Sequence, residues 1–598
     1  MRIQVSTILT LVTCFCSSVR GVESTKQQLA IVTLGTQVED LKFVDIRGLE
    51  RNLREFGSYR AVVLTFTTTT CPLVRQYLPR LTELNAEFRS QGVIFVAVNV
   101  GAGDTIRQMA SQAIDYQVPF YFVKDIDGSC AQALGVRKSP EVVVLDSKNS
   151  LRYRGRIDDQ LRIGGAKPEA SRHDLREAIL EVLGDLPVSV PQTEVDGCWI
   201  TPAAKPVAAG PDVTWSGQIA KLVHQKCSNC HRADTAASFE LQTYDDVASN
   251  AQMIADVVRL ETMPPWYASR AHGQFQNDTS LTGDEKNMLI SWIAAGCPAG
   301  DLSASPEPPS APKTQWRIGE PDLILTMAEE HTVPATGFVP YKYVSLPHHF
   351  KEETWVEAFE IRPLNAAVVH HCNMFHMSKE GAGSDTFITG YVPGGQPMDL
   401  GNYDNGVAYR LPPGSTLSLQ IHYTTIGTEQ KGQIQVGLRF PRREVRKRLY
   451  HFIVDPRGWK ISPNDPAFRI EGSHTLPRNA NLLGMFTHMH VRGRDMTFIA
   501  EQQGQPAETL LQIPNYNFDW QLGYELAPGK KVFPKGTKIR AVAHYDNSPF
   551  NPYNPDSNDT VEYGPQTIHE MFNGFAFYVD QDETLSIQVD PANGKVID

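Results

Sequence analysis

Side chains that bind soft metals gather in two short segments of the last third of this chain. The first, "VVHHCNMFHM", runs from Val368 to Met377 and contains three histidines, a cysteine and two methionines. The second contains His488 and His490, one residue apart. Imidazole nitrogen combined with thioether sulfur suits copper, especially Cu(I). The sequence therefore predicts a copper-binding region here.

Strand geometry sorts these histidines. Successive side chains of a β-strand point to opposite faces, so His488 and His490 share one face and suit one metal ion. In "LPPGSTLSLQIHYTT" the same rule puts His422 on the polar face, where it is available to a metal. His370 and His371 are adjacent, and a regular strand would point them apart. Both can bind one ion only if a bulge or local twist interrupts the strand.

The same region contains an internal repeat. "LPPGSTLSLQIHYTT" and "FPKGTKIRAVAHYDN" align without gaps, so that His422 matches His544. A histidine cluster precedes each copy at a similar separation. We interpret this as two similar domains in tandem, in which His544 is a candidate ligand as the twin of His422.

A third segment has the spacing of a haem attachment site. Cys227, Cys230 and His231 form C-x-x-C-H. Two thiols at this spacing add to the haem vinyl groups, and the adjacent histidine takes the proximal position on the iron. Zinc would need further ligands, and the chain has no second C-x-x-C. The pattern predicts one covalently attached c-type haem.

The sixth iron ligand should come from a later segment. "LETMPPWYASR" offers Met263 and resembles the distal methionine loop of small cytochromes c; a thioether there raises the haem potential, which suits electron transfer. The rival ligands are Met253, His272 and Met288, of which the two methionines follow helical patterns typical of core residues. Cys198 and Cys297 flank this haem segment, and a disulfide between them is a hypothesis.

A lone cysteine near the N-terminus has the setting of a reactive thiol. Cys71, in "TTTTCPLVRQYLP", follows a predicted strand and begins a predicted helix, whose N-terminus favours the thiolate. The segment resembles the redoxin/peroxiredoxin branch of the thioredoxin superfamily, and Pro140 matches the proline that faces the active-site cysteine there. It departs from that family in two ways: C-x-x-C spacing is missing, and Leu64 replaces a usual proline. Cys130 could resolve a sulfenic acid or pair with Cys71, or Cys71 could be inert.

The ligand order in the last third resembles a second family, the copper type II ascorbate-dependent monooxygenases (dopamine β-hydroxylase and peptidylglycine α-hydroxylating monooxygenase). The resemblance covers about 316 to 580 and implies two copper ions. The implied ligands are His370, His371 and His422 for the first copper, and His488, His490 and Met571 for the second, with His544 as a rival to Met571. Together with the redoxin and cytochrome segments, the chain resembles bacterial fusions of these three modules.

That resemblance implies an exported monooxygenase, which would hydroxylate a C–H bond of a small organic substrate with O2 at the methionine-bound copper. Electrons would come through the haem, from an ascorbate-like reductant or a redox protein. Peptide hydroxylation is disfavoured, because Phe486 stands where the peptide enzyme has an arginine. That enzyme has an asparagine and a tyrosine after its methionine ligand. This chain keeps the asparagine, at Asn573, but has Phe575 in place of the tyrosine.

Two other functions stay open. The β region could bind copper without catalysis while the haem relays electrons, in a redox or copper-handling protein. Alternatively, the redoxin segment could carry the main activity, as a thiol peroxidase or disulfide reductase acting through Cys71.

Length and composition limit the fold and the functions that this chain can have. With 598 residues the chain is too long for one core, so several domains are expected. Hydrophobic residues make up 41% and charged residues 21%, which is typical of globular proteins, and no later stretch looks membrane-spanning. A net charge of -11 without a basic stripe argues against nucleic-acid binding.

The expected fold is therefore multidomain. We predict a thioredoxin-like α/β domain, a small all-α cytochrome c domain and two tandem all-β sandwiches of the jelly-roll type. The N-terminal apolar run predicts a signal peptide and a periplasmic or secreted protein. The predicted boundaries are 1–22 signal peptide, 29–188 redoxin, 189–212 linker, 213–302 haem domain, 303–315 linker, and 316–442 and 443–590 for the two β domains.

Overall fold

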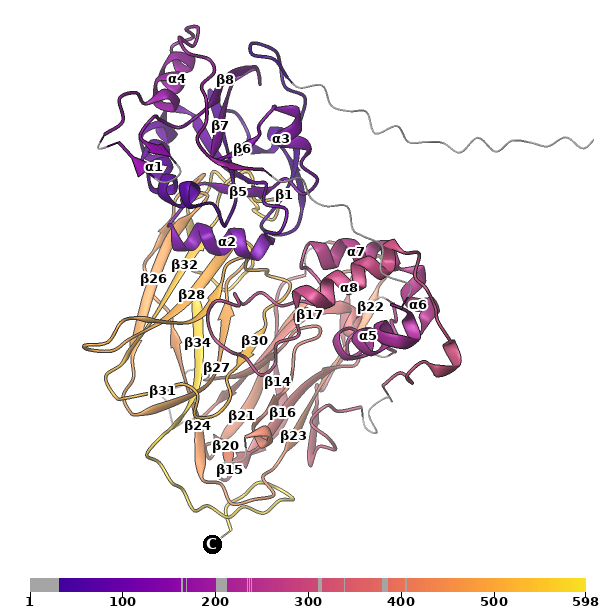
Figure 1. The fold of residues 1–598 in the computed structure, drawn as a ribbon. Coiled ribbons are helices and arrows are strands. Elements are labelled where there is room, and N and C mark those ends of the chain that lie inside the picture. The colour runs from indigo at the N-terminus through magenta and orange to yellow at the C-terminus, as the bar shows by residue number, and fades with distance from the viewer. Residues whose placement is uncertain are drawn as a thin grey trace, which may run out of the picture.

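The computed structural model describes residues 32–597 apart from 163–164, 168, 201–211, 234, 236, 238, 310–314, 338, 379–385 and 404–405. The predicted signal peptide and most of the first linker lie outside these residues. Figure 1 shows an α/β domain, a helical segment beside it, and a large β part below both. Among the described helices, none is long and apolar enough to cross a membrane.

A seven-stranded sheet forms the centre of the N-terminal domain. In sheet order its strands are β2 (Glu50–Asn52), β1 (Lys42–Asp45), β5 (Tyr121–Lys124), β4 (Val93–Asn99), β3 (Ala61–Thr67), β7 (Glu141–Asp146) and β8 (Leu151–Gly155). Strands β3, β4 and β5 run parallel, and β7 runs antiparallel to β3. Every residue of β3 is buried, as expected for a strand covered on both faces.

Helices cover both faces of this sheet. Apolar residues of α1 (Pro72–Phe88), α2 (Ile106–Asp115) and α4 (Asp174–Leu183) share one core. The short α3 (Ser129–Ala133) packs into a second core on the other face. The predicted α/β layers are confirmed. Two short strand pairs lie outside the main sheet: β6 (Lys138–Ser139) with β11 (Cys198–Trp199), and β9 (Leu161–Arg162) with β10 (Gly165–Ala166).

The segment 213–302 is mainly helical in its described residues. After a π-helical turn (Trp215–Ile219) come α5 (Ala220–Lys226), α6 (Tyr244–Ser249), α7 (Ala251–Arg259) and α8 (Gly283–Ala294). Trp215 and Trp292 are buried at its core, with ring centroids 6.4 Å apart. The segment is anchored on the β part, because Trp266 and Tyr267 insert into the core of the second β module.

The first β module consists of two four-stranded sheets around one apolar core. One contains β12 (Leu323–Thr326), β23 (Ile434–Arg439), β16 (Ala358–Pro363) and β19 (Met398–Asp399). The other contains β14 (Lys342–Phe350), β21 (Ser415–Tyr423), β17 (Val369–Met377) and β18 (Thr386–Tyr391). A small pair, β13 (His331–Val333) and β22 (Gln430–Gly432), lies outside both sheets.

The second β module has its own core and is continuous with the first. Its first sheet contains β24 (Lys447–Val454), β34 (Asn573–Asp580), β27 (Ala480–His488), β30 (Gly523–Glu525) and β31 (Val532–Phe533). Its second contains β26 (Phe468–Thr475), β32 (Lys538–Tyr545), β28 (Gly493–Glu501) and β29 (Glu508–Ile513). The first sheet extends into the other module, since β15 (Thr354–Val356) and β20 (Val407–Leu411) join it through the parallel pair β20–β24. The pair β25 (Lys460–Ile461) and β33 (Val561–Glu562) completes the module.

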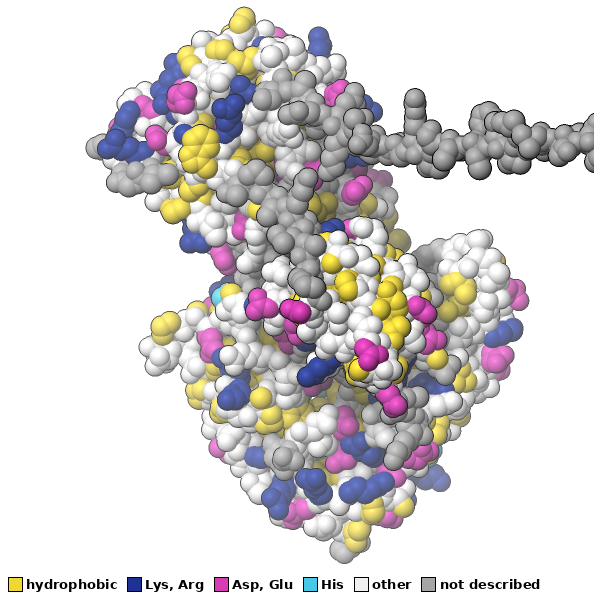
Figure 2. Space-filling view, turned by 45° about the vertical axis from the view of Figure 1, so that its right-hand side comes forward, with side chains coloured by type: hydrophobic (Ala, Val, Ile, Leu, Met, Phe, Trp, Pro, Cys, Tyr) yellow, Lys and Arg dark blue, Asp and Glu magenta, His cyan; other side chains and the backbone are white. Residues whose placement is uncertain are grey.

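The α/β domain docks on the second β module through an aromatic contact. Phe550 is 3% exposed and stacks on Phe56 with ring centroids 4.3 Å apart. The Arg51 guanidinium lies 3.8 Å from the Phe550 ring centroid, and Arg47 pairs with Asp546 at 3.4 Å. On the face shown in Figure 2, acidic and basic side chains are interspersed rather than gathered in one block.

Candidate functional sites

Three histidines converge on neighbouring strands of the first β module. The pairing of β17 with β21 shifts register between Val369 and His371, and this irregularity is the break that adjacent His370 and His371 required. His371 lies directly opposite His422. One ring nitrogen from each of these three residues falls within 4.8 Å of the others, which is close enough for one metal ion.

The surroundings of these rings suit a metal ligand. His371 is 1% exposed, and its Nε2 atom, like Nδ1 of His422, is buried without a hydrogen-bond partner. Burial and the neighbouring imidazoles lower the pKa of His371 well below its usual value and that of His422 to about 3. Both rings are therefore neutral at physiological pH, the form that binds a metal. Unpartnered buried nitrogens are costly, and an ion would satisfy them.

His488 and His490 form a second pair at the end of β27. Their ring centroids are 5.2 Å apart. His488 donates from Nδ1 to Gln521 Oε1 at 2.6 Å, and His490 donates from Nδ1 to the His569 carbonyl at 3.1 Å. These bonds leave Nε2 as the free nitrogen of each neutral ring, and Nε2 of His490 is buried without a partner. Burial lowers the pKa of both rings.

Met571 lies beside this second pair. Asn573 stands directly opposite His488 on β34, and its amide donates to the Met571 sulfur at 3.7 Å. The preceding Glu570 is fully buried and accepts bonds from the backbone nitrogens of His490 (2.8 Å) and Arg492 (2.7 Å). Burial raises the pKa of Glu570 to about 7. Glu570 thus holds the His490 and Met571 segments together, a role that the sequence patterns did not identify.

The two histidine sets are adjacent. The rings of His371 and His488 have centroids 6.3 Å apart, so the first β module meets the second at this point. The Phe518 ring lies among them, stacked on His370 at 5.3 Å and edge-on to His490 at 6.1 Å. The structure therefore joins five of the predicted ligands into one partly buried centre.

A single segment, Asn517–Gln521, contacts both sets. Asp519 Oδ1 accepts a bond from His370 Nε2 at 2.9 Å, so His370 Nδ1 is unprotonated and accepts a bond from His371 Nδ1 at 3.1 Å. Gln521 accepts the bond from His488 described above. Trp520 extends toward the C-x-x-C-H segment: a methyl group added to Gly394 would lie 3.5 Å from the Trp520 ring and 3.4 Å from Cys230 Sγ. Hydrogen bonds of this kind fix which ring nitrogen faces a metal.

The predicted equivalence of His544 with His422 holds for the strands but not for the sites. Strand β32 lies between β26 and β28, as β21 lies between β14 and β17. Across from His544, however, β28 offers Asp495, which accepts its Nδ1 proton at 2.7 Å. His488 belongs to β27, in the other sheet of the module. The two histidine clusters are therefore not repeat equivalents.

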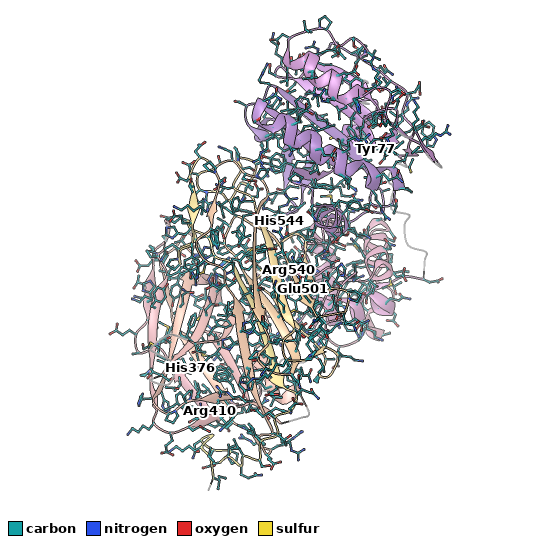
Figure 3. All side chains as sticks on the ribbon, turned by 90° about the vertical axis from the view of Figure 1, so that its left-hand side faces the viewer. Tyr77, His376, Arg410, Glu501, Arg540 and His544 are labelled. Atoms are coloured by element: carbon teal, nitrogen blue, oxygen red, sulfur yellow. The ribbon has the colours of Figure 1, made fainter. Side chains whose placement is uncertain are left out.

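Two histidines lie apart from the centre. Figure 3 shows His544 near the end of the β part closest to the α/β domain, whereas His376 lies toward the opposite end. His376 is 6% exposed, and its Nδ1 atom lies 2.9 Å from the Tyr409 hydroxyl. The segment "VVHHCNMFHM" thus contributes only its adjacent pair to the cluster.

The C-x-x-C-H segment follows directly on α5. The backbone nitrogens of Cys230 and His231 both donate to the Cys227 carbonyl, so the segment turns tightly there. His231 donates from Nδ1 to the Phe239 carbonyl at 3.1 Å, which leaves Nε2 free for an iron. Half-buried Met263 follows α7, and of its rivals Met253 is exposed and Met288 packs on the helical core. These donors fit a c-type haem, which stays a prediction.

Cys71 has an unexpected neighbour. It precedes α1 as its N-cap residue and is 2% exposed. Its sulfur lies 3.2 Å from the Ser139 carbonyl, beside the cis bond to Pro140, and 2.8 Å from Cys198 Sγ. The predicted Cys198–Cys297 disulfide is therefore wrong, since Cys297 packs in the helical core instead.

Cys130 does not reach Cys71 either. Its thiol donates to the Lys42 carbonyl at 2.9 Å, in the core on the other face of the sheet from Cys71. Burial raises the pKa of Cys130 well above its usual range. Cys130 is a core residue, and the suggested pairing with Cys71 is corrected.

Comparison with known proteins identifies one of these parts. Residues 34–170 match the Redoxin family. The thiol-disulfide oxidoreductase ResA of Halalkalibacterium halodurans is 25% identical over 123 residues, which are 20% of this chain and 68% of ResA. A hypothetical protein of Sinorhizobium meliloti 1021 is 28% identical, with a TM-score of 0.27, and covers 29% of this chain and 98% of its own. A putative thiol:disulfide interchange protein DsbE of Chlorobium tepidum is 24% identical, with a TM-score of 0.21, covering 26% of this chain and 99% of its own. Residues 34–170 thus form a redoxin domain of the thioredoxin-like type.

Proposed function

We propose that this chain is an oxidoreductase with two separate centres, a thiol centre in the redoxin domain and a copper centre in the β part. For the first, we propose thiol–disulfide exchange with Cys71 as the nucleophile. The observation that carries it is the position of Cys71, at the start of α1 and against the Ser139–Pro140 bond. The similarity of this domain to ResA, a protein named for thiol–disulfide exchange, supports it.

This function is tested with the full chain and a small disulfide. Reduced protein is mixed with oxidised glutathione, and adducts on each cysteine are mapped by mass spectrometry. We expect Cys71 to react first, and Cys71→Ser to abolish the exchange. Cys130→Ser is the matched control, because that thiol is buried in another core and should not contribute. Exchange that persists at the wild-type rate in Cys71→Ser would refute the proposal.

A second function is favoured by the histidine centre: copper-dependent hydroxylation of a C–H bond with O2. Its carrying observation is the convergence of unpartnered, buried imidazole nitrogens from two β modules. His370, His371 and His422 would hold one copper, and His488, His490 and Met571 the other. Bound copper would supply one-electron redox chemistry and O2 activation, and thioether ligation at the second site favours Cu(I).

The surroundings of the second set support an apolar substrate. Phe486 and Phe575 stand opposite each other on β27 and β34, two residues along from His488 and Asn573. Phe387 of the first module packs on Phe575 with ring centroids 4.6 Å apart. These rings offer no charged partner for a substrate carboxylate, and we propose a small organic substrate rather than a peptide.

In this proposal Cys227 and Cys230 would hold a c-type haem covalently, His231 and Met263 would bind its iron, and the bound haem would supply electron transfer. Copper binding and haem attachment both fit an extracytoplasmic protein, and we propose a periplasmic or secreted location. The deciding measurement is metal and haem analysis of protein matured with haem-attachment machinery, followed by O2 uptake. We expect one covalent haem, two coppers and substrate hydroxylation. Zinc-loaded protein without copper, or O2 uptake no faster than that of free copper, would contradict this function.

A further inference from the structure

We infer that Cys198 is the resolving thiol of the redoxin domain, which closes a disulfide with Cys71 in place of the second cysteine of a C-x-x-C. This inference rests on the proposed thiol–disulfide exchange and names the residue that completes it. Cys198 lies outside residues 34–170, the stretch that matches the Redoxin family. It follows Cys71 by 127 positions in the chain.

The two sulfurs are already in contact. Cys198 Sγ lies 2.8 Å from Cys71 Sγ. Cys71 is 2% exposed and Cys198 is half-buried, so Cys198 is the more exposed thiol of the pair. Among the described cysteines of this domain, Cys130 lies in the other core. Cys198 is therefore the thiol placed to react with Cys71.

Strand pairing holds Cys198 in this position. β11 pairs antiparallel with β6, so that Cys198 stands opposite Ser139, whose carbonyl also contacts Cys71. Lys138 Nζ donates to the Val195 carbonyl at 2.7 Å and lies 5.1 Å from the centroid of the Trp199 ring. The strand approaches so closely that a Cβ on Gly197 would lie 2.7 Å from the Ser139 oxygen, so only glycine fits there.

The protonation of Cys198 suits a thiol that attacks second. The S–H of Cys198 donates to Cys71 Sγ. Burial and the adjacent Cys71 sulfur raise the pKa of Cys198 to about 11, so Cys198 is protonated at neutral pH. We place attack by Cys71 first, because Cys71 lies at the N-terminus of α1, and attack by Cys198 second.

The exchange balances as a two-electron transfer. Cys71 releases its proton to water, attacks one sulfur of a substrate disulfide and forms a mixed disulfide, and the other half leaves as a thiolate that takes up a proton from water. Cys198 then attacks the Cys71 sulfur, and its proton passes to the second thiolate that leaves. The substrate disulfide is reduced to two thiols, and Cys71 and Cys198 are oxidised to one disulfide.

Peptide mapping of the full chain without reduction tests this inference. After treatment with oxidised glutathione, we expect a Cys71–Cys198 linked peptide in the wild type. In Cys198→Ser the second attack is lost, and glutathione should stay bound to Cys71. Cys198→Ala repeats the test with a smaller side chain, and Cys297→Ser is the control that should leave the linked peptide unchanged.

The possible results distinguish a failure of this inference about Cys198 from a failure of the proposed thiol–disulfide exchange. If Cys71 reacts with glutathione disulfide but the linked peptide never forms in the wild type, Cys198 is not the resolving thiol, although the exchange function stands. If Cys71 does not react at all, both fail. Equal lifetimes of the glutathione adduct in the wild type and in Cys198→Ser would also overturn the role of Cys198.

Discussion

His371, His422 and His490 of the metal centre each bury one ring nitrogen that has no hydrogen-bond partner. His370 is bound through Nε2 to Asp519, whereas His488 and His490 are bound through Nδ1. The unpartnered nitrogen is Nε2 in His371 and His490 but Nδ1 in His422. Spacing in the sequence identified which histidines come together, but not which nitrogen each one presents, because that depends on partners distant in the chain.

His422→Ala should remove one of the two coppers. Its Nδ1 atom has no hydrogen-bond partner in the structure, so the change deletes a ligand without leaving another polar group unpaired. We expect metal analysis to fall from two coppers to one, with the haem retained. His544→Ala is the matched control, since His544 is its twin by repeat but pairs with Asp495. Loss of a copper in His544→Ala would contradict the assignment.

The contact between Cys71 and Cys198 was not predicted from the sequence. Cys71 was identified from its own neighbours, a strand before it and a helix after it. Cys198 has only a short strand, "CW", whose pairing with Lys138 and Ser139 is a tertiary contact. No local pattern in the sequence encodes that pairing, and flanking position suggested Cys297 instead.

At the scale of elements, the repeat predicted similar strands, and β21 and β32 occupy the same place in their four-stranded sheets. The division into two β domains stays a prediction, because one sheet contains strands of both modules. The repeat failed for the ligands because the two clusters lie on different sheets relative to the repeated strands. His370 and His371 are on β17, which pairs with β21, whereas His488 is on β27, in a different sheet from β32. The prediction that His370 and His371 need an interrupted strand is confirmed by the register shift. The alternation of side chains along a strand thus predicted which histidines share one face of that strand. Which histidines meet across two sheets depended on the order of the strands in those sheets.

The segment Asn517–Gln521 is the element whose contribution to the metal centre can be tested most directly. Asp519→Ala removes the carboxylate that orients His370, and we expect copper affinity at the first site to fall about tenfold, the lower end for such partners. Affinity is measured by competition with a chelator. Asp582→Ala, which removes an exposed carboxylate of the same module, should leave it unchanged. Equal affinities in both variants would show that Asp519 does not position His370.

At the scale of the whole molecule, the redoxin domain, the helical segment and the second β module are packed together, because side chains of one lie in the core of another. Phe550 of the second β module packs in the redoxin core, and Trp266 of the helical segment packs in the core of that β module. Composition and linkers predicted the separate parts, but these contacts join residues hundreds of positions apart. The linkers therefore connect domains that are also packed against one another.

The junction of the two β modules should make stability depend on pH. His376 of β17 and His451 of β24 lie near one another there, and burial lowers the pKa of each to about 4. The unfolded chain binds protons at these histidines near pH 6.5, whereas the folded chain does not. Their stabilising contribution is therefore full above about pH 6.5 and is lost as the pH falls toward about 4. Tyr409 and Arg448 are the other polar groups that face this pair.

A double variant isolates this effect. In His376→Gln/His451→Gln no proton can bind at either position, so the free energy of unfolding should fall less steeply with acidification than in the wild type. Urea unfolding at pH 7.5, 6.0 and 5.0 measures the difference, and carboxylates common to both proteins cancel in it. Parallel slopes for the double variant and the wild type would show that the junction histidines are not held neutral by burial.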